Sequence, residues 1–183
     1  FPPKDAILFI GSSSFTMWKD VQNYFPGHTI INRGFGGSSL PDVIRYADDI
    51  IIPYSPKQIM IYCGENDFAG SDTVTAQLVF ARFKQLFSII REHYTKVKIT
   101  YVSMKPSPSR VRLMPKMMEA NLLIKNFLKK KKKKLSNAEL LQTALTEEYQ
   151  GTKVELSEKV RILLQELKEA PKLEIPQGLT ATL

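Results

Sequence analysis

The stretch Ala6-Ile-Leu-Phe-Ile-Gly-Ser-Ser-Ser14 joins a short apolar run to a glycine and three serines. A run of this kind is typical of a buried strand, and small polar residues mark its end. Two later runs end in the same way: Thr29 to Asn32 leads into Arg-Gly-Phe-Gly-Gly-Ser-Ser39, and Gln58 to Cys63 leads into Gly-Glu-Asn-Asp67. A fourth strand is predicted from Lys98 to Met104.

Helical patterns alternate with these strands. The clearest runs from Val74 to about Tyr94, and Asp72 is placed to cap its first turn. A second is predicted after Pro115. The apolar residues that recur at helical spacing are Leu78, Val79, Phe83, Leu86, Phe87 and Ile90 in the first, and Met118, Leu122, Leu123 and Phe127 in the second. Alternating strands and helices predict right-handed crossovers, and hence an α/β fold with three layers: a flavodoxin-like parallel sheet between two layers of helices.

The loops that follow parallel strands meet at one edge of the sheet, where such folds bind ligands. The three polar clusters are therefore expected to line one crevice. Each cluster taken alone has a simpler interpretation, as a turn or as the cap of the next helix. Three clusters in order along one edge favour a binding site.

Together the clusters resemble the sequence blocks of the SGNH hydrolases, the GDSL-like esterases and lipases, over residues 6–128. The resemblance implies that Ser13, in Gly11-Ser-Ser13, is the nucleophile, with Ser12 where the family usually has Asp. It also implies that the backbone N–H groups of Ser13 and Gly37, with Gly36 as the alternative register, hold the oxyanion. The block Gly64-Glu-Asn-Asp67 is complete, which makes Asn66 the third donor. The resemblance further implies that four residues around these donors bind the substrate: Ser12, Gly36, Gly64 and Asp67.

This resemblance implies cleavage of a small carboxylic or acetyl ester without a cofactor. The negative charge of the tetrahedral intermediate would fall on an oxygen that faces the three fixed donors. Arg33, Phe35, Phe68, Lys105 and Arg110 are expected to flank the crevice. The acyl or sugar group of the substrate is left open.

The general base is missing from the sequence. The family's late Asp-x-x-His block and the strand before it have no counterpart, because no Asp or His follows Lys129. The two histidines, His28 and His93, each precede a predicted strand, which places them ~17 Å from the catalytic loops. Asp67 and Glu65 are the substitute bases, but their spacing does not favour either. We therefore expect impaired hydrolysis, with a non-catalytic binding module that keeps the crevice as the alternative.

The net charge of +8 is a local feature. Six of these charges are the run Lys129 to Lys134, which leaves +2 for the rest of the chain. The run has no interleaved aromatic residues for base stacking, and the segment after it is net acidic. A solvated helix is favoured over a nucleic-acid site.

The composition changes after the lysines. All but one of the 18 aromatic residues precede Lys129. We predict a hydrolase-like domain over 1–128, a junction over 129–134 and a helical hairpin over 135–183. Its first helix would open at the capping box Ser136-Asn-Ala-Glu139, and its second, with Val160, Leu163, Leu164 and Leu167 in its apolar stripe, would end at Pro171.

The end of the tail, Leu173 to Leu183, is similar to the stretch that leads into the helicase core of Swi/Snf-type DNA-dependent ATPases. The chain is therefore predicted to be a chimera of two unrelated pieces, joined near the lysine run.

Other classes of protein are excluded more simply. No apolar stretch approaches the roughly 20 residues of a membrane span. Two distant histidines and the single Cys63, which is expected in the core, do not make a metal site. Because the chain begins at Phe1, removal of an export signal is one explanation of its start. The compartment and the oligomeric state are left open.

Overall fold

The computed structural model describes residues 2–105 and 107–148, with 133–148 described only as helical backbone. The chain divides into two units, Phe1–Phe127 and Leu128–Leu183. The site lies in the first unit, to which the following account is confined except for the course of the last helix.

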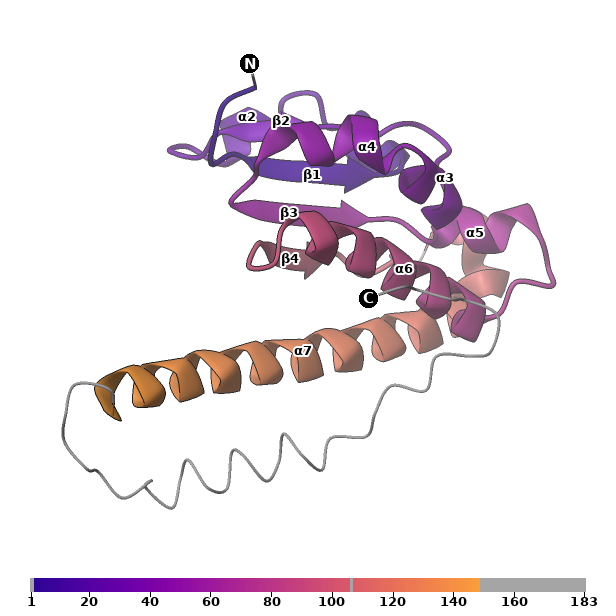
Figure 1. The fold of residues 1–183 in the computed structure, drawn as a ribbon. Helices are drawn as coiled ribbons and strands as arrows, with labels where there is room; N and C mark the ends of the chain where they lie inside the picture. Colours follow the sequence, from indigo (N-terminus) through magenta and orange to yellow (C-terminus); the bar gives the residue numbers. More distant parts are fainter. Residues whose placement is uncertain (1, 106, 149–183) are drawn as a thin grey trace. The chain divides into compact units, whose positions relative to one another are not determined.

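Four parallel strands form the sheet (Figure 1), as the sequence predicts. They are β1 (Ile7–Gly11), β2 (Ile30–Asn32), β3 (Gln58–Tyr62) and β4 (Lys98–Tyr101), in the order β2-β1-β3-β4. Ile7 pairs with both Ile30 and Gln58, and Gln58 pairs with Lys98, so the four strands begin along one line. All their carboxyl ends therefore face the same edge.

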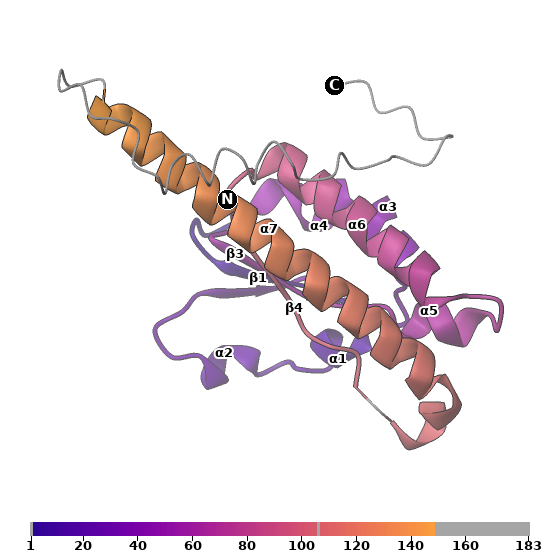
Figure 2. The same cartoon turned by 90° about the horizontal axis from the view of Figure 1, so that it is seen from below.

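Helices cover both faces of this sheet. Figure 2 shows α1 (Ser13–Thr16) and α2 (Val21–Tyr24) on one side of the strands, and α3 (Leu40–Arg45), α4 (Ala47–Ile50) and α6 (Ala76–His93) on the other. This is the predicted three-layer α/β/α architecture. The connection after β1 runs to β2 on one side of it, whereas the connection after β3 runs to β4 in the opposite direction. The direction in which strands are added to the sheet therefore reverses between β1 and β3. In folds of this type, such a switch point is where ligands bind.

The two faces of the sheet follow the alternation of side chains along the strands. Leu8, Ile10, Ile59 and Ile61 share one face and are fully buried. Phe9 and Tyr62 lie on the other face and pack with Phe15 of α1 and Val21 of α2. The ring centroids of Phe9 and Phe15 are 4.8 Å apart. This packing fixes the serine-bearing helix α1 against the sheet.

The start of α6 differs from the prediction. Thr75 caps this helix, because its Oγ1 accepts a hydrogen bond of 3.2 Å from the N–H of Leu78. Asp72, predicted as the cap, instead pairs with Arg112 at 2.9 Å. The predicted apolar stripe of α6 is buried except for Leu78, which is 41% exposed.

Helix α7 spans Met114–Glu148 and follows a 3-10 segment, η2 (Pro108–Leu113). Among its residues whose side chains are described, those that are buried are Met117, Ala120 and Ile124. The predicted apolar face is half right: Leu123 is half-buried and Phe127 packs against Phe87 with the ring centroids 5.0 Å apart, whereas Met118 and Leu122 are exposed. The prediction of a new helix at Ser136 is wrong, because α7 continues through the lysine run and past this residue. No glycine or proline interrupts it there, and lysine favours helix.

The predicted second tail helix and the stretch Leu173 to Leu183 lie outside the described residues. The chimeric origin of the tail stays a prediction. Among the helices that the structure describes, none has both the length and the apolar character needed to cross a membrane.

Candidate active site

The serine loop, Gly11 to Ser14, begins at the end of β1, where the backbones of β1 and β3 lie very close together. Gly11 has φ +127°, and a Cβ built there would lie 2.0 Å from the carbonyl oxygen of Tyr62. Only glycine fits this position. The N–H of Ser12 donates to the same oxygen at 2.9 Å. Ser12 is buried, whereas Ser13 is exposed at the start of α1.

The loop between β2 and α3, residues 33–39, is called the glycine loop, and it packs against the serine loop. The N–H of Phe35 donates to the carbonyl of Gly11 at 2.9 Å, and Asn32 Nδ2 donates to the carbonyl of Phe15 at 2.7 Å. Gly37 follows with φ +76° and is exposed, whereas Gly36 has no such φ. The structure thus requires a glycine at position 37 more strongly than at position 36.

The loop after β3 carries Asn66 in the first turn of α5 (Glu65–Gly70). Its Nδ2 donates to the carbonyl of Ser38 at 2.9 Å, and its Oδ1 accepts from Arg110 Nη2 at 2.8 Å. Asn66 is therefore held against the glycine loop. The three predicted blocks come together at one edge of the sheet through these contacts.

Glu65 is a buried carboxylate whose two oxygens are both engaged. One oxygen accepts from the hydroxyl of Tyr62 and from the N–H of Lys105 at 3.2 Å, and the other accepts from Arg110 Nη1 at 3.2 Å. Burial, and secondly the hydrogen bond to Glu65, raise the pKa of Tyr62 to about 12. Tyr62 is thus a protonated donor near neutral pH.

Asp67 is also buried and engaged. Its Oδ2 accepts from the N–H of Leu40 at 2.8 Å, and its Oδ1 pairs with Arg82 at 2.7 Å. Burial raises its pKa above the ordinary value, although Leu40 and Arg82 act in the opposite direction. These contacts hold α3, α5 and α6 together. Whether Asp67 also touches a substrate stays a prediction, as it does for Ser12, Gly36 and Gly64.

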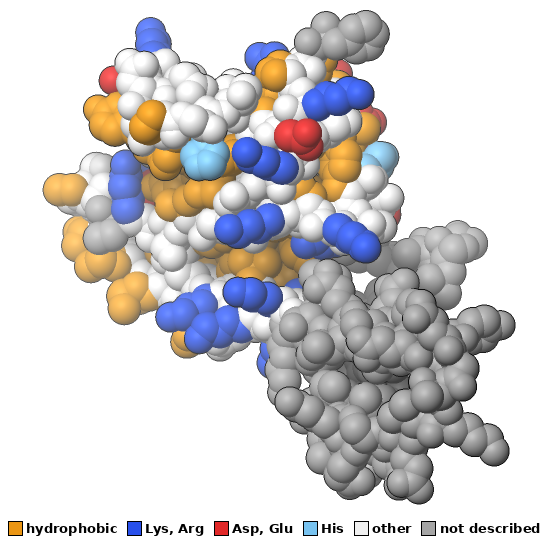
Figure 3. All heavy atoms as spheres, turned by 90° about the vertical axis from the view of Figure 1, so that its left-hand side faces the viewer, with side chains coloured by type: hydrophobic (Ala, Val, Ile, Leu, Met, Phe, Trp, Pro, Cys, Tyr) orange, Lys and Arg blue, Asp and Glu red, His pale blue; other side chains and the backbone are white. Residues whose placement is uncertain are grey.

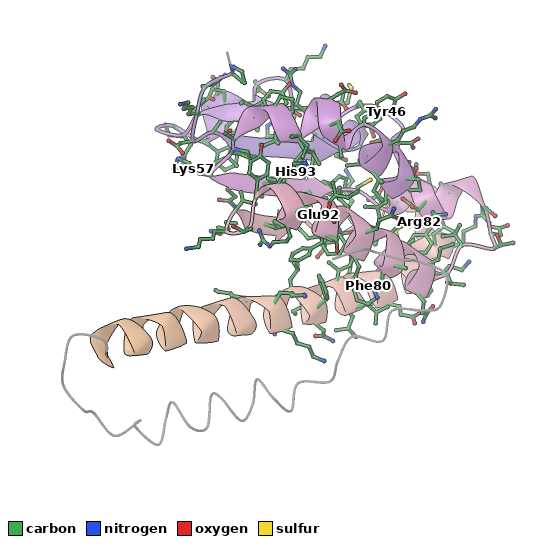
Figure 4. The ribbon with its side chains drawn as sticks, in the orientation of Figure 1. Tyr46, Lys57, Phe80, Arg82, Glu92 and His93 are labelled. Carbon is green, nitrogen blue, oxygen red and sulfur yellow. The ribbon has the colours of Figure 1, made fainter. Side chains whose placement is uncertain are left out.

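The histidines lie where the sequence places them, at the other end of the sheet. His28 is exposed and precedes β2, and His93 is exposed at the end of α6, where Nδ1 lies 3.1 Å from the carbonyl of Ile89. Both pale-blue histidine side chains are visible in Figure 3, which faces the side where the strands begin. In Figure 4, His93 lies toward the same end of the sheet as Lys57, which precedes β3. Arg82, also on α6, lies nearer to the opposite end. Neither histidine is near Ser13.

Two basic residues contribute more than the sequence indicated. Lys105 and Arg110 were expected only to flank the crevice. Lys105 Nζ lies 3.3 Å from Ser14 Oγ and 5.9 Å from the centroid of the Tyr62 ring, and Arg110 contacts both Glu65 and Asn66. Of the other residues expected beside the crevice, Phe68 is buried in the core. Within the described residues, no three or more His, Cys, Asp or Glu side chains are grouped to hold a metal ion.

No protein-family model matches the sequence, and no curated protein matches it significantly. The fold, however, is similar to that of solved structures. A GDSL-like lipase from Bacteroides thetaiotaomicron matches with TM-score 0.60 at 20% identity, over 70% of this chain and 65% of that one. A lipase/acylhydrolase from Enterococcus faecalis matches with TM-score 0.52 at 14% identity, over 67% and 70%.

A variant of an acetyl xylan esterase from Geobacillus stearothermophilus matches with TM-score 0.52 at 16% identity, over 71% of this chain and 74% of that one. The chain spans only 50% of a matched structure from Streptococcus pneumonia. At these identities the likeness shows the fold alone. The parallel α/β/α domain of this chain has the fold of the GDSL-like lipases and acylhydrolases.

Proposed function

We propose that this domain is an SGNH-type serine ester hydrolase whose catalysis is impaired by the lack of a general base. Ser13 is the nucleophile, and the N–H groups of Ser13 and Gly37 together with Asn66 Nδ2 form the oxyanion site. The observation that carries the proposal is the contact between Asn66 Nδ2 and the carbonyl of Ser38, 2.9 Å long, which joins the Asn66 loop to the Gly37 loop. The fold shared with lipases and acylhydrolases supports it.

The proposed chemistry begins with attack of Ser13 Oγ on the carbonyl carbon of a small ester. The carbonyl oxygen then carries a negative charge, which the three donors stabilise; one such donor is typically worth ~3 kcal/mol. Collapse of the intermediate expels the alcohol and leaves an acyl-serine, which water hydrolyses. The hydroxyl proton of Ser13 passes to solvent as the bond to carbon forms, and the leaving oxygen takes up a proton as the alcohol departs. Attack by Ser13, and later by water, is faster when a base removes the proton of the attacking hydroxyl, and expulsion of the alcohol is faster when that proton is given to the leaving oxygen.

No described group is placed as that base. The histidines lie at the opposite end of the sheet, and the oxygens of Glu65 and Asp67 are already hydrogen-bonded to other groups. A serine hydrolase that lacks a member of its triad retains ~10³-fold acceleration over water, through the oxyanion site and binding. We infer turnover of this residual size.

The alternative function is a binding module that uses the crevice without turnover. It is favoured by the placement of both histidines before strands, at the end of the sheet opposite to Ser13, which leaves this serine without a described imidazole. Ser13, Gly37 and Asn66 would then serve only as hydrogen-bond donors to a ligand carbonyl.

The test is labelling by a fluorophosphonate probe and hydrolysis of p-nitrophenyl acetate by the full chain. Ser13→Ala is the test variant, and Ser14→Ala, which removes the neighbouring hydroxyl, is its matched control. Slow labelling and hydrolysis that require Ser13 but not Ser14 would support the hydrolase. No dependence on Ser13 in a folded sample would refute it and leave the binding module.

A further inference from the structure

The side-chain amide of Asn66 is hydrogen-bonded through both its oxygen and its nitrogen. Arg110 Nη2 donates to its Oδ1 at 2.8 Å, and its Nδ2 donates to the carbonyl of Ser38 at 2.9 Å. A guanidinium has only donors and a carbonyl only accepts, so both contacts select one orientation of the amide. Turning the amide over would place N–H groups against Arg110 and two oxygens against each other at Ser38.

This orientation matters for the proposed oxyanion site. One Nδ2 hydrogen is used by Ser38, and the second has no acceptor among the residues that the structure describes. A cationic donor on Oδ1 also draws electrons from the amide, which makes the Nδ2 hydrogens better donors. Arg110 therefore acts on Asn66 in two ways, by aiming the amide and by polarising it.

Arg110 is itself fixed by a buried partner. Its Nη1 pairs with Glu65 at 3.2 Å, where the Glu65 side chain is 11% exposed and that of Arg110 is 30% exposed. Glu65 is held in turn by the hydroxyl of Tyr62 and the N–H of Lys105. A side chain with this many fixed neighbours can hold an amide in place better than a freely moving surface arginine.

We propose that Arg110 is a positioning residue of the oxyanion site, which fixes and polarises the Asn66 amide so that its second Nδ2 hydrogen is presented to a substrate oxygen. This inference rests on the proposed function for its catalytic consequence. Its structural part, the control of the Asn66 amide by Arg110, stands on the contacts alone.

The kinetic test measures the rate at which a fluorophosphonate labels Ser13 in the full chain. We expect Asn66→Ala to slow labelling about 100-fold, as loss of an oxyanion donor does, and Arg110→Met to slow it about tenfold. The double variant should be no slower than Asn66→Ala, because Arg110 acts through that side chain. A purely structural arginine would instead slow both backgrounds equally.

Arg112→Met is the matched control. It removes the same kind of side chain two positions away, from an ion pair with Asp72 whose members are 68% and 76% exposed. Labelling should be unchanged in this variant. If Arg110→Met fails to fold because Glu65 loses its counter-charge, Glu65→Gln/Arg110→Met removes both charges and serves in its place.

A second readout does not need reactivity. Nitrogen-15 NMR of the Asn66 side chain, assigned by its loss in Asn66→Ala, reports rotation about the Cγ–Nδ2 bond through exchange of its two hydrogens. A cationic hydrogen bond at Oδ1 increases the double-bond character of this bond, so Arg110→Met should quicken the exchange several-fold while Arg112→Met does not.

The outcomes separate the two proposals. Unchanged amide exchange in Arg110→Met overturns the inference, whatever the kinetics. Labelling that depends on Asn66 but is indifferent to Arg110 also overturns it and leaves the proposed function intact. Labelling that does not require Ser13, with quickened amide exchange in Arg110→Met, refutes the proposed function and keeps the structural part of the inference.

Discussion

The N–H of Leu40 donates a hydrogen bond of 2.8 Å to the carboxylate of Asp67, across 27 positions of the chain. This bond ties the start of α3, which follows the glycine loop, to the turn that carries Asn66. The other carboxylate oxygen pairs with Arg82 of α6. A single buried side chain thus connects the two loops of the proposed oxyanion site with the helix behind them.

We expect Asp67→Ala to lower the free energy of unfolding by about 3 kcal/mol, because it leaves a buried N–H and an arginine without their partner. Asp72→Ala is the control: it breaks the exposed pair with Arg112 and should cost less than about 0.5 kcal/mol. Urea unfolding measures both. If Asp67→Ala lowered the free energy of unfolding as little as Asp72→Ala does, the Asp67 contacts would not stabilise the fold.

Gly37 and Gly36 should respond differently to alanine. Gly37 has φ +76°, which costs a residue with a Cβ about 1 kcal/mol, whereas alanine at Gly36 meets no atom within 4 Å and no unusual φ. Gly37→Ala should therefore destabilise the domain and slow labelling of Ser13, and Gly36→Ala should leave both nearly unchanged. The reverse order would assign the oxyanion role to Gly36.

Much of the sheet could be predicted because each strand is a contiguous apolar run that ends in small polar residues. The parallel pairing of the strands, the edge that bears Ser13, Gly37 and Asn66, and the opposite placement of the histidines follow from that pattern and from the alternation with helices, whereas the order of the strands does not. Contacts between distant segments could not be predicted in this way. Nothing local to Arg110 indicates that it reaches Asn66, 44 positions earlier in the chain.

Errors occurred where two local signals competed. Asp72 and Thr75 are both good caps, and the contact of Asp72 with Arg112, 40 positions away, was not visible in the sequence. Ser136 begins a good capping box, but an unbroken run of helix-forming residues before it outweighs the cap. The apolar face of α7 was predicted too wide: Phe127 packs against α6, whereas Met118 and Leu122, next in the chain to or near the buried Met117 and Ile124, point to solvent.

The thiol of Cys63 should be protected in the folded chain. The residue is 1% exposed, and burial raises the pKa of its thiol, so little thiolate is present at neutral pH. Iodoacetamide should leave Cys63 unmodified in buffer and modify it fully in denaturant, as followed by mass spectrometry. Rapid modification under native conditions would contradict the burial of this end of β3.

The capping box of α3 should make stability depend on pH. The hydrogen bonds from the side chain and the backbone of Ser39 lower the pKa of Asp42 below 3.8. The folded state therefore binds this proton less readily than the unfolded state, so the stabilisation is present above pH 3.8 and is lost as the pH falls through the lowered pKa. Asp42→Asn should cost about 1 kcal/mol near neutral pH, with a difference from the parent that shrinks in acid.

The control for this prediction is Asp20→Asn. Asp20 precedes α2, is exposed and makes no capping hydrogen bond through its side chain. Its replacement should change stability by less than about 0.5 kcal/mol. A difference between parent and Asp42→Asn that stays constant down to acid pH would mean that the carboxylate charge does not contribute to the cap.

The last prediction concerns the missing base. If neither histidine serves Ser13, then His28→Ala/His93→Ala should label with a fluorophosphonate at the parental rate, because both side chains are exposed at the end of the sheet opposite to the serine loop. The parental rate should also show no inflection near the ordinary histidine pKa of about 6.5. A loss of labelling in the double variant would place an imidazole in reach of Ser13, and the single variants would then identify which one. A parental rate in the double variant, combined with dependence on Ser13, would mean that the serine reacts through the oxyanion site without help from histidine.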